Sequence, residues 1–485
     1  MSAETKSKDM KYYIFAAIGL IIMFGFSFVV QPFGPVTELG VKYLGIFIGL
    51  IWLWSTCDMG WPVFAAFVAM LVLKCDTVTT VLTGYSNFAV MMSIFTMMAI
   101  MPVAEASGMF SYIAKWLMNQ KFIKGHPWVL SVSIFVLAFI AALINAGLVA
   151  LFFCYDLVLK ICDGAGMKRT SSWAGAMYAG ITISAILGMM GMPFYAPALT
   201  ALGIMGGAGI AVNLNFLVYI ASILVYAVIM IALYAAAMKF IMRVDVAALK
   251  DGSTPTMMAD LPPMSKQQKQ YTIFTLAFIV AVVVTGSAGS LPANAVTNFL
   301  NGLGTVGVCF IFIAILLIWR IDGKPAFRLG SLYNGVMWDS VMIVWGAMVL
   351  AGTLTAEATG ISTFLAMTVA PFFAGKSVVV FLILFGLVTL ILTNFFNNMV
   401  IMILMFSCTA AIMMQMGINM FLVLFVLTVA SQMGVLLPGA SFYAGIYHGF
   451  ADQIGRTNCI TWGAVAMVVV GIALVIFIPL MVAVL

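Results

Sequence analysis

Charged residues are scarce in this 485-residue sequence: Asp, Glu, Lys and Arg make up only 7% of it, whereas 65% is hydrophobic. A soluble domain carries about 25% charged residues, so the composition excludes a soluble globular protein. Apolar stretches of about 20 residues, long enough to cross a bilayer as helices, recur from Lys11 to the C-terminus. The sequence therefore predicts an all-α polytopic protein of the cell membrane, in contact with lipid.

Residues that carry catalysis or bind metals are also few. The sequence has two histidines and seven scattered cysteines, with no CxxC pair. It has no glycine-rich phosphate loop with a lysine, which excludes ATP-driven pumping by this chain alone. An enzyme would need acids, bases or metal ligands clustered at one interface, and none is seen. We therefore expect that the protein is not an enzyme. The net charge of +6 is explained by basic residues in cytoplasmic loops, so we expect no nucleic-acid partner.

The basic residues that remain indicate the topology. Lys and Arg gather in a few loops, which the positive-inside rule assigns to the cytoplasm. Residues 1–39 form a charged tail and a first span that is too long for a cleaved signal peptide, so we expect a retained span and a cytoplasmic N-terminus. The basic clusters are Lys6–Lys11, Lys115–Lys124, Lys160–Arg169, Lys239–Lys250, Lys266 with Lys269, and Arg320–Arg328.

One apolar stretch, 128–162, has basic residues at both ends and is too long for a simple span. A segment that starts and ends on the cytoplasmic side must enter the membrane and return. Asn145 lies near its middle, where irregular backbone is tolerated only if protein or a water-filled cavity surrounds it. We predict a re-entrant hairpin over about 127–162 with Asn145 at its tip.

The second half of the chain echoes the first. "AEASG" at 104–108 recurs as "AEATG" at 356–360, and the same spacing superimposes Asn145 on Asn397. A third match pairs "GMMGMPFYA", which starts at Gly188, with "GVLLPGASFYA", which starts at Gly434. An echo that also aligns two polar interruptions of apolar runs indicates an internal repeat.

The halves are expected to have opposite orientations. The first inverted repeat is predicted at 40–243, a polar cytoplasmic linker at 244–270, and the second repeat at 271–485 with an external-side hairpin at about 377–415. This gives about 11 transmembrane helices and two opposed re-entrant hairpins. Inverted repeats with discontinuous helices that meet near the midplane are the architecture of secondary transporters.

The candidate site centres on "ILTNFFNNMV" at 391–400, where three asparagines interrupt an apolar run. Asn145 and Asn397 each precede the second arm of a hairpin, where Asn is a favoured N-cap. Helix N-termini suit an anion, and unwound carbonyls with Asn oxygens suit Na+. Asn394 is expected to serve packing. The predicted substrate-binding residues are Asn145, Ala146, Gly147, Asn397, Asn398, Pro193 and Ser441; the predicted Na+ ligands are Asn145, Gly191, Asn397 and Gly439.

An alternative interpretation remains for each of these residues. Gly and Pro are common in membrane helices, and a polar side chain in a membrane often joins helices without binding a substrate. Glu105 and Glu357 occupy matching positions at span ends, which favours capping over substrate binding or proton coupling. Asp156 lies four residues before Lys160, which predicts an ion pair on one helix face.

This layout resembles the divalent anion:sodium symporter family of the ion transporter superfamily, over essentially the whole chain after the first span. In that family each hairpin tip carries Ser-Asn-Thr and each broken span a Thr-Pro-type segment, which together build two sodium sites beside one substrate. Here the tips read "INA" at 144–146 and "FNN" at 396–398, so only the asparagine is kept. The segments "GMP" at 191–193 and "LPGAS" at 437–441 stand in place of the Thr-Pro pairs.

The resemblance implies a homodimer that moves a small anion, such as a di- or tricarboxylate, with Na+ as the coupling ion and an elevator-type mechanism. An alternative within the same superfamily is a proton-driven, potential-driven or exchange transporter of an inorganic anion or oxyanion. The hydroxyls missing from the tips leave both the substrate and the coupling ion open.

Overall fold

The computed structural model describes the whole chain except residues 1–2, 59, 85–91, 93–99, 101, 119, 124, 145–146, 250–261, 322, 335, 337, 374 and 439. Three predicted site residues, Asn145, Ala146 and Gly439, lie outside the described residues, as does most of the stretch 88–107.

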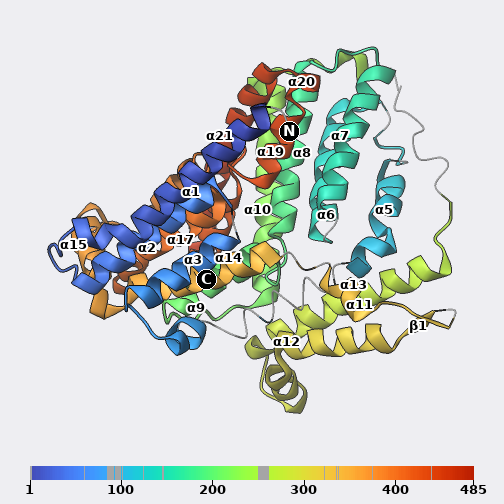
Figure 1. Cartoon of the computed structure of the whole chain (residues 1–485). Helices are drawn as coiled ribbons and strands as arrows, with labels where there is room; N and C mark the ends of the chain where they lie inside the picture. Colours follow the sequence, from blue (N-terminus) through green and yellow to red (C-terminus); the bar gives the residue numbers. More distant parts are fainter. Residues whose placement is uncertain are drawn as a thin grey trace.

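Helices make up nearly all of the described regular structure (Figure 1). In the first half they are α1 (Ala3–Val29), α2 (Glu38–Thr56), α3 (Trp61–Val72), the π-helical turn η1 (Thr80–Gly84), α5 (Met109–Met118), α6 (Pro127–Leu143), α7 (Gly147–Gly164), α8 (Ser172–Met189), α9 (Ala196–Gly207), α10 (Phe216–Ala236), the π-helical turn η2 (Ala237–Ile241) and the 3-10 turn η3 (Ala247–Leu249).

The second half contains α11 (Lys266–Ser287), the turn η4 (Ala288–Ser290), α12 (Ala295–Ile318), strands β1 (Arg320–Ile321) and β2 (Lys324–Pro325), α13 (Leu329–Tyr333), α14 (Trp338–Thr355), the turn η5 (Glu357–Thr359), α15 (Ile361–Phe373), α16 (Val378–Leu392), α17 (Asn398–Gln415), α18 (Met420–Gln432), α19 (Phe442–Gly449), α20 (Ala451–Ile454) and α21 (Arg456–Val484). The two strands form a small antiparallel hairpin.

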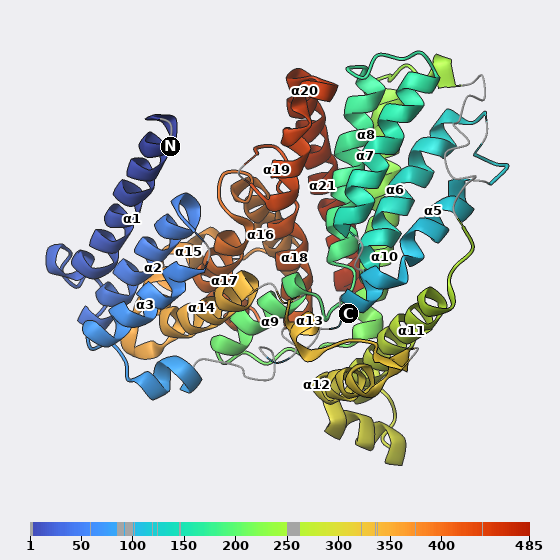
Figure 2. The ribbon, with the colours of Figure 1, turned by 45° about the vertical axis from the view of Figure 1, so that its right-hand side comes forward.

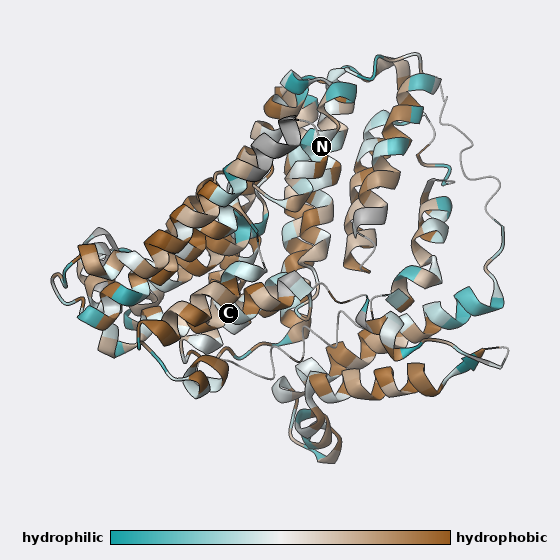
Figure 3. Ribbon diagram, viewed as in Figure 1, coloured by the Kyte–Doolittle hydropathy of each residue, from teal (hydrophilic) through white to brown (hydrophobic). Residues whose placement is uncertain are grey.

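Eight of the described helices are long and apolar enough to cross a membrane. This confirms a multi-pass all-α membrane protein; the count of about 11 spans and the re-entrant hairpins stay predictions. Large apolar side chains cover the outside of peripheral helices, such as Phe28 of α1 and Ile318 of α12, both more than three-quarters exposed. Figure 3 shows hydrophobic residues along most helices and hydrophilic ones gathered at their ends, for example around α20.

Polar residues at the helix starts explain where many helices begin. The first N–H groups of a helix have no intrahelical acceptor, which is costly in apolar surroundings. Ser171, Asn215 and Ser377 accept such N–H groups at α8, α10 and α16. Ser265 forms a capping box with Gln268, so α11 begins at Lys266, inside the segment predicted as linker up to residue 270.

Contacts near helix ends connect the two halves of the chain. The Thr37 N–H donates to the Thr359 carbonyl at 3.0 Å. Asn458 Nδ2 donates to the Thr170 carbonyl at 2.9 Å. Each of these two contacts joins one segment of the first half to one of the second.

The two echoed pentapeptides have the same local structure. The side chain of Ser107 donates to the Ala104 carbonyl at 2.6 Å, and that of Thr359 to the Ala356 carbonyl at 2.7 Å. The following glycines both have positive φ, +62° at Gly108 and +69° at Gly360. Their N–H groups donate to the carbonyls of the two echoed glutamates at 3.1 Å each. The sequence echo is thus accompanied by a repeated backbone turn.

The two halves interlock rather than lying side by side. In the first half α6 packs along α8, and in the second α16 packs along α18. The short helix α9 of the first half extends into the second, against α14, α17 and α18. In return α19 of the second half lies against α8 of the first (Figures 1 and 2). Each half therefore contributes a short helix that packs among the helices of the other half.

Candidate functional site: hairpin tips and helix breaks

Each half of the chain places a pair of contacting helices against a helix that is interrupted. The first hairpin is α6 with α7, and the first break, 190–195, separates α8 from α9. The second hairpin is α16 with α17, and the second break, 433–441, separates α18 from α19. The term "module" is used below for one hairpin tip together with the break of the same half.

In the second module, Asn394 joins the tip to the break. Its side chain is only 4% exposed, and its Oδ1 accepts the N–H groups of Val435 at 3.1 Å and Leu436 at 2.9 Å. Its Nδ2 donates to the Leu390 carbonyl at 2.7 Å within α16. Residues that leave a helix lose their intrahelical acceptors, and this amide replaces two of them. Asn394 is therefore structural, but it reaches beyond its own arm to the break.

Asn397 and Asn398 have different partners. Asn397 is the N-cap of α17, as expected, and its Oδ1 accepts the Met399 N–H at 2.9 Å. Asn398 Nδ2 donates to Oε1 of the buried Gln432 at 2.7 Å, which ties it to α18. Among the described residues, no acceptor lies within hydrogen-bond distance of Asn397 Nδ2. Asn397 therefore offers free N–H donors at a half-buried helix start.

Ser441 forms hydrogen bonds within the second break and at the start of α19. Its hydroxyl donates to the Gly434 carbonyl at 2.9 Å and accepts the Ala444 N–H at 3.0 Å, as the N-cap of α19. Thr393 of the hairpin donates to the Ser431 carbonyl. The Ser441 hydroxyl, predicted to bind substrate, is thus engaged in local structure.

In the first module, the break touches the hairpin through glycines. A Cβ atom at Gly188 would lie 2.2 Å from the carbonyl oxygen of Phe139, and one at Gly191 would lie 2.2 Å from Cδ1 of Leu143. Gly434, the counterpart of Gly188 in the echoed sequence, makes a similar approach to the Thr393 carbonyl, at 2.7 Å. Gly191 and Pro193 are both buried in this contact region. At Gly188 glycine is needed because the neighbouring backbone leaves no room for a Cβ, whereas at Gly191 the space is taken by the Leu143 side chain.

Two tyrosines from the echoed "FYA" segments flank the first hairpin tip. Tyr195 donates to the carbonyl of Leu143, the last residue of α6, at 2.8 Å. A Cβ atom at Gly147, the first residue of α7, would lie 2.8 Å from the hydroxyl oxygen of Tyr443. The structure therefore brings predicted site residue Gly147 next to α19 of the other half. Sequence reasoning did not assign either tyrosine to the site, although the repeated "FYA" was a signal that both occupy special positions.

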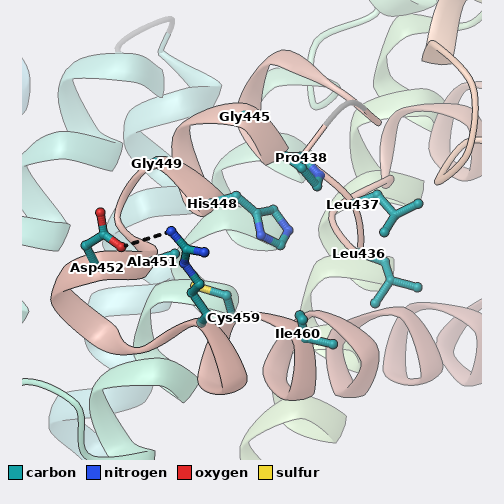
Figure 4. Close-up of a pocket in the computed structure, with 11 residues that line it drawn as sticks. Leu436, Leu437, Pro438, Gly445, His448, Gly449, Ala451, Asp452, Cys459 and Ile460 are labelled. Atoms are coloured by element: carbon teal, nitrogen blue, oxygen red, sulfur yellow. Dashed lines mark ion pairs between the residues drawn. The ribbon is translucent and has the colours of Figure 1, made fainter.

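A pocket of about 560 Å³ lies between the second break and the start of α21 (Figure 4). His448 lies near its centre, with Nε2 3.2 Å from the Val435 carbonyl oxygen, and Pro438 is part of the wall. Arg456 and Asp452 form an exposed ion pair at 3.6 Å, a contact that adds little stability. The pocket brings a cationic side chain and an imidazole close to the break. No motif in the sequence predicts it, because its lining residues come from the break, from α19 and α20, and from the start of α21.

The described part of the chain has no group of three or more His, Cys, Asp or Glu side chains placed to hold a metal ion. A coupling Na+ would use backbone and amide oxygens instead. The predicted ion pair between Asp156 and Lys160 is confirmed, with 2.7 Å between Oδ2 and Nζ.

Long apolar helices, with a pair of contacting helices and an interrupted helix in each half, define the class as a multi-pass membrane protein. No protein-family model and no curated protein matches the chain. Among solved structures it is similar to MtrF of Neisseria gonorrhoeae, described as illuminating a class of antimetabolite efflux pumps: 13% identity, a TM-score of 0.51, and coverage of 96% of this chain and 93% of MtrF. It is also similar to the YdaH transporter of Alcanivorax borkumensis: 16% identity, a TM-score of 0.52, and coverage of 84% and 89%.

At such identities the likeness shows the fold alone, which this chain shares with these two membrane proteins. The narrower resemblance to divalent anion:sodium symporters finds no support in these comparisons.

Proposed function

We propose that the protein is a secondary active transporter that moves a small anion, most simply a di- or tricarboxylate, across the cell membrane. Support comes from the transporter fold and from the two modules, in each of which the second hairpin arm begins beside an interrupted helix. The observation that carries the proposal is the start of α17, where Asn397 caps the helix and keeps free N–H donors.

Electrostatics favours an anion at such a position. A helix N-terminus carries about half a positive charge, and its first N–H groups are free to donate. Both effects are stronger where water is excluded, because the local dielectric constant is low. The starts of α7 and α17 together would offset the charge of a carboxylate or an oxyanion without a basic side chain.

For coupling we propose Na+, held by oxygens that the helix breaks release near Gly191 and Gly439, together with Asn145 and Asn397. Backbone carbonyls and amides are the ligands that hard cations prefer. Asn397 would contribute the second lone pair of Oδ1, since the first accepts the Met399 N–H. Movement of the hairpins relative to the remaining helices, in an elevator-type cycle within a homodimer, would expose the site to each side in turn.

A second candidate is a proton-driven, potential-driven or exchange transporter of an inorganic anion or oxyanion, working outward. It is favoured by the absence of Ser and Thr hydroxyls from "INA" and "FNN", which removes ligands that a sodium site would use. The similar MtrF is described as belonging with efflux pumps, so the direction of transport is also part of this test.

The test is a flux measurement with purified protein in liposomes. Succinate, citrate, sulfate and phosphate would be assayed with an inward Na+ gradient, with K+ in its place, with a proton gradient, and with an imposed membrane potential. We expect saturable uptake of at least one carboxylate that rises with the Na+ gradient. Flux driven only by protons or potential would favour the second candidate, and no flux above protein-free liposomes in any condition would contradict both.

A further inference from the structure

We propose that Tyr443 is a substrate-binding residue, whose hydroxyl donates a hydrogen bond to an anionic oxygen held at the N-terminus of α7. This inference rests on the proposed function and adds a specific donor to it. The ligand group is a carboxylate or a comparable oxyanion, because both the helix start and the hydroxyl offer hydrogen atoms and neither offers a negative charge.

The position of the hydroxyl is the first observation. A Cβ atom at Gly147 would lie 2.8 Å from the Tyr443 oxygen, so this oxygen lies at the first turn of α7. The helix has 18 residues, so its N-terminus carries the full dipole effect. Tyr443 itself comes from α19 of the other half of the chain. A ligand here would contact both halves at once.

The second observation is that this hydroxyl has no protein partner among the described residues, although Tyr443 is only 7% exposed. Its oxygen is not one of the fully enclosed side-chain oxygens that lack a partner in the described part of the chain, so it faces a space that water or a ligand can enter. Buried tyrosine hydroxyls normally bind a polar group. A donor that is open to a small space at the start of a long helix is therefore placed to bind an anionic ligand.

Tyr195 provides an internal comparison. It occupies the same place in the other "FYA" segment, and it is also 7% exposed. Its hydroxyl, however, donates to the Leu143 carbonyl at 2.8 Å and is therefore satisfied by the protein. Two equivalent tyrosines thus flank one hairpin tip, one engaged in structure and the other free.

Gly147 fits the same account. Any side chain at this position would come within 2.8 Å of the Tyr443 oxygen and would fill the space where the anion is expected. Ala at Gly147 should therefore weaken anion binding while leaving the helix intact, because Ala favours a helix more than Gly does.

The experiment compares Tyr443→Phe with Tyr195→Phe in proteoliposomes, using as probe whichever of succinate, citrate or sulfate the wild type transports. We expect Tyr443→Phe to raise KM about tenfold with little change in maximal rate, and to lose the rise in melting temperature that the anion gives the wild type. Tyr195→Phe should lower the melting temperature of the anion-free protein and leave KM within about twofold of the wild-type value.

A double variant guards against indirect effects. Gly147→Ala should raise KM in the wild-type background but add little in the Tyr443→Phe background, because the added methyl group then meets the space left by the missing hydroxyl. An unchanged KM in a folded Tyr443→Phe protein, or equal KM effects of the two tyrosine variants, would overturn the proposal. Absence of anion transport by the wild type would instead overturn the proposed function, so the two failures are distinguishable.

Discussion

The two modules are related in sequence but are held together in different ways. In the second module, side chains connect the hairpin to the break: Asn394 to Val435 and Leu436, and Asn398 to Gln432. In the first module, among the described residues, the contact is made by close backbone packing at Gly188, by the Leu143 side chain against Gly191 and by the hydrogen bond of Tyr195. The second tip is fixed by the protein itself, whereas the first retains the free hydroxyl of Tyr443 beside it.

This difference suggests a division of roles. A network of satisfied polar groups rigidifies the segment that contains it. The second module has such a network, so its tip should keep one conformation with or without substrate. The first module is held by packing, and the Tyr443 hydroxyl beside its tip can donate a hydrogen bond to a bound anion. The predictions below test this contrast, from the largest expected effect to the smallest.

The largest effect should follow from Gly188→Ala. The new Cβ would lie 2.2 Å from the Phe139 carbonyl oxygen, a backbone atom that cannot turn aside. Overpacking of this kind costs about 3 kcal/mol, so we expect little folded protein in a detergent melting assay. Gly434→Ala, with its closest contact at 2.7 Å, should be milder. Gly302→Ala is the control, since nothing lies within 4 Å of its added Cβ; equal melting temperatures for Gly188→Ala and this control would refute the packing account.

Asn394→Ala should have the next largest effect. The change leaves the N–H groups of Val435 and Leu436 without their acceptor, which should destabilise the protein by about 2 kcal/mol. The matched control is Asn419→Ala, which removes a single capping bond to the Phe421 N–H and should cost about 1 kcal/mol. Melting temperatures of the two variants give the comparison. If Asn394→Ala were no less stable than the control, the second module would not be held by its side chains.

The tip asparagines should affect transport more than stability. We expect Asn397→Ala and Asn145→Ala each to lower initial uptake at least tenfold, which corresponds to about 1.4 kcal/mol. Asn397→Ala removes a cap worth about 1 kcal/mol, and both changes remove a predicted donor to the substrate. Asn398→Ala is expected to alter substrate preference because Asn398 lies beside the tip, and to lower the melting temperature because the buried Gln432 Oε1 loses its donor. Uptake is normalised to reconstituted protein; near-normal rates for both tip variants would show that these asparagines only join helices.

The smallest effect should come from the exposed ion pair of Asp163 with Arg169, at 2.6 Å. The hydrogen bonds from Arg169, and then its charge, hold the pKa of Asp163 below its ordinary value. A lowered folded-state pKa contributes stability above the unfolded pKa of about 3.9, and this contribution disappears as the pH falls through the folded value. Arg169→Gln should thus melt slightly below the wild type near neutral pH and together with it in strong acid. A difference that grew with acidification would contradict this assignment.

Much of the helix order was predictable because the signals for it are local. Apolar runs, the polar residues that cap them and the Gly-Pro interruptions at 188–193 are read directly along the chain. The Asn397 cap and the Asp156–Lys160 pair depend on neighbours within four residues, and both predictions are confirmed. Helix α11 begins at Lys266, before the predicted end of the linker at residue 270, because the Ser265 capping box starts the helix within polar sequence.

Contacts between distant segments were not predictable. Asn394 was expected to serve packing, but its bonds to Val435 and Leu436 depend on how α16 lies against the second break. The approach of Tyr443 to Gly147 joins opposite halves of the chain, and no composition or spacing contains that information. The residues that distinguish the two modules are therefore the ones that only the folded arrangement reveals.

The most direct test of the contrast is amide hydrogen exchange of the unmodified protein, with and without a saturating concentration of the transported anion. We predict that backbone N–H groups at 147–151, the start of α7, exchange at least tenfold more slowly when the anion is bound. Those of Val435 and Leu436, which the Asn394 Oδ1 accepts, should already be protected without the anion and should change little. Unchanged exchange at 147–151, with new protection confined to the second module, would contradict an anion site at the first hairpin tip.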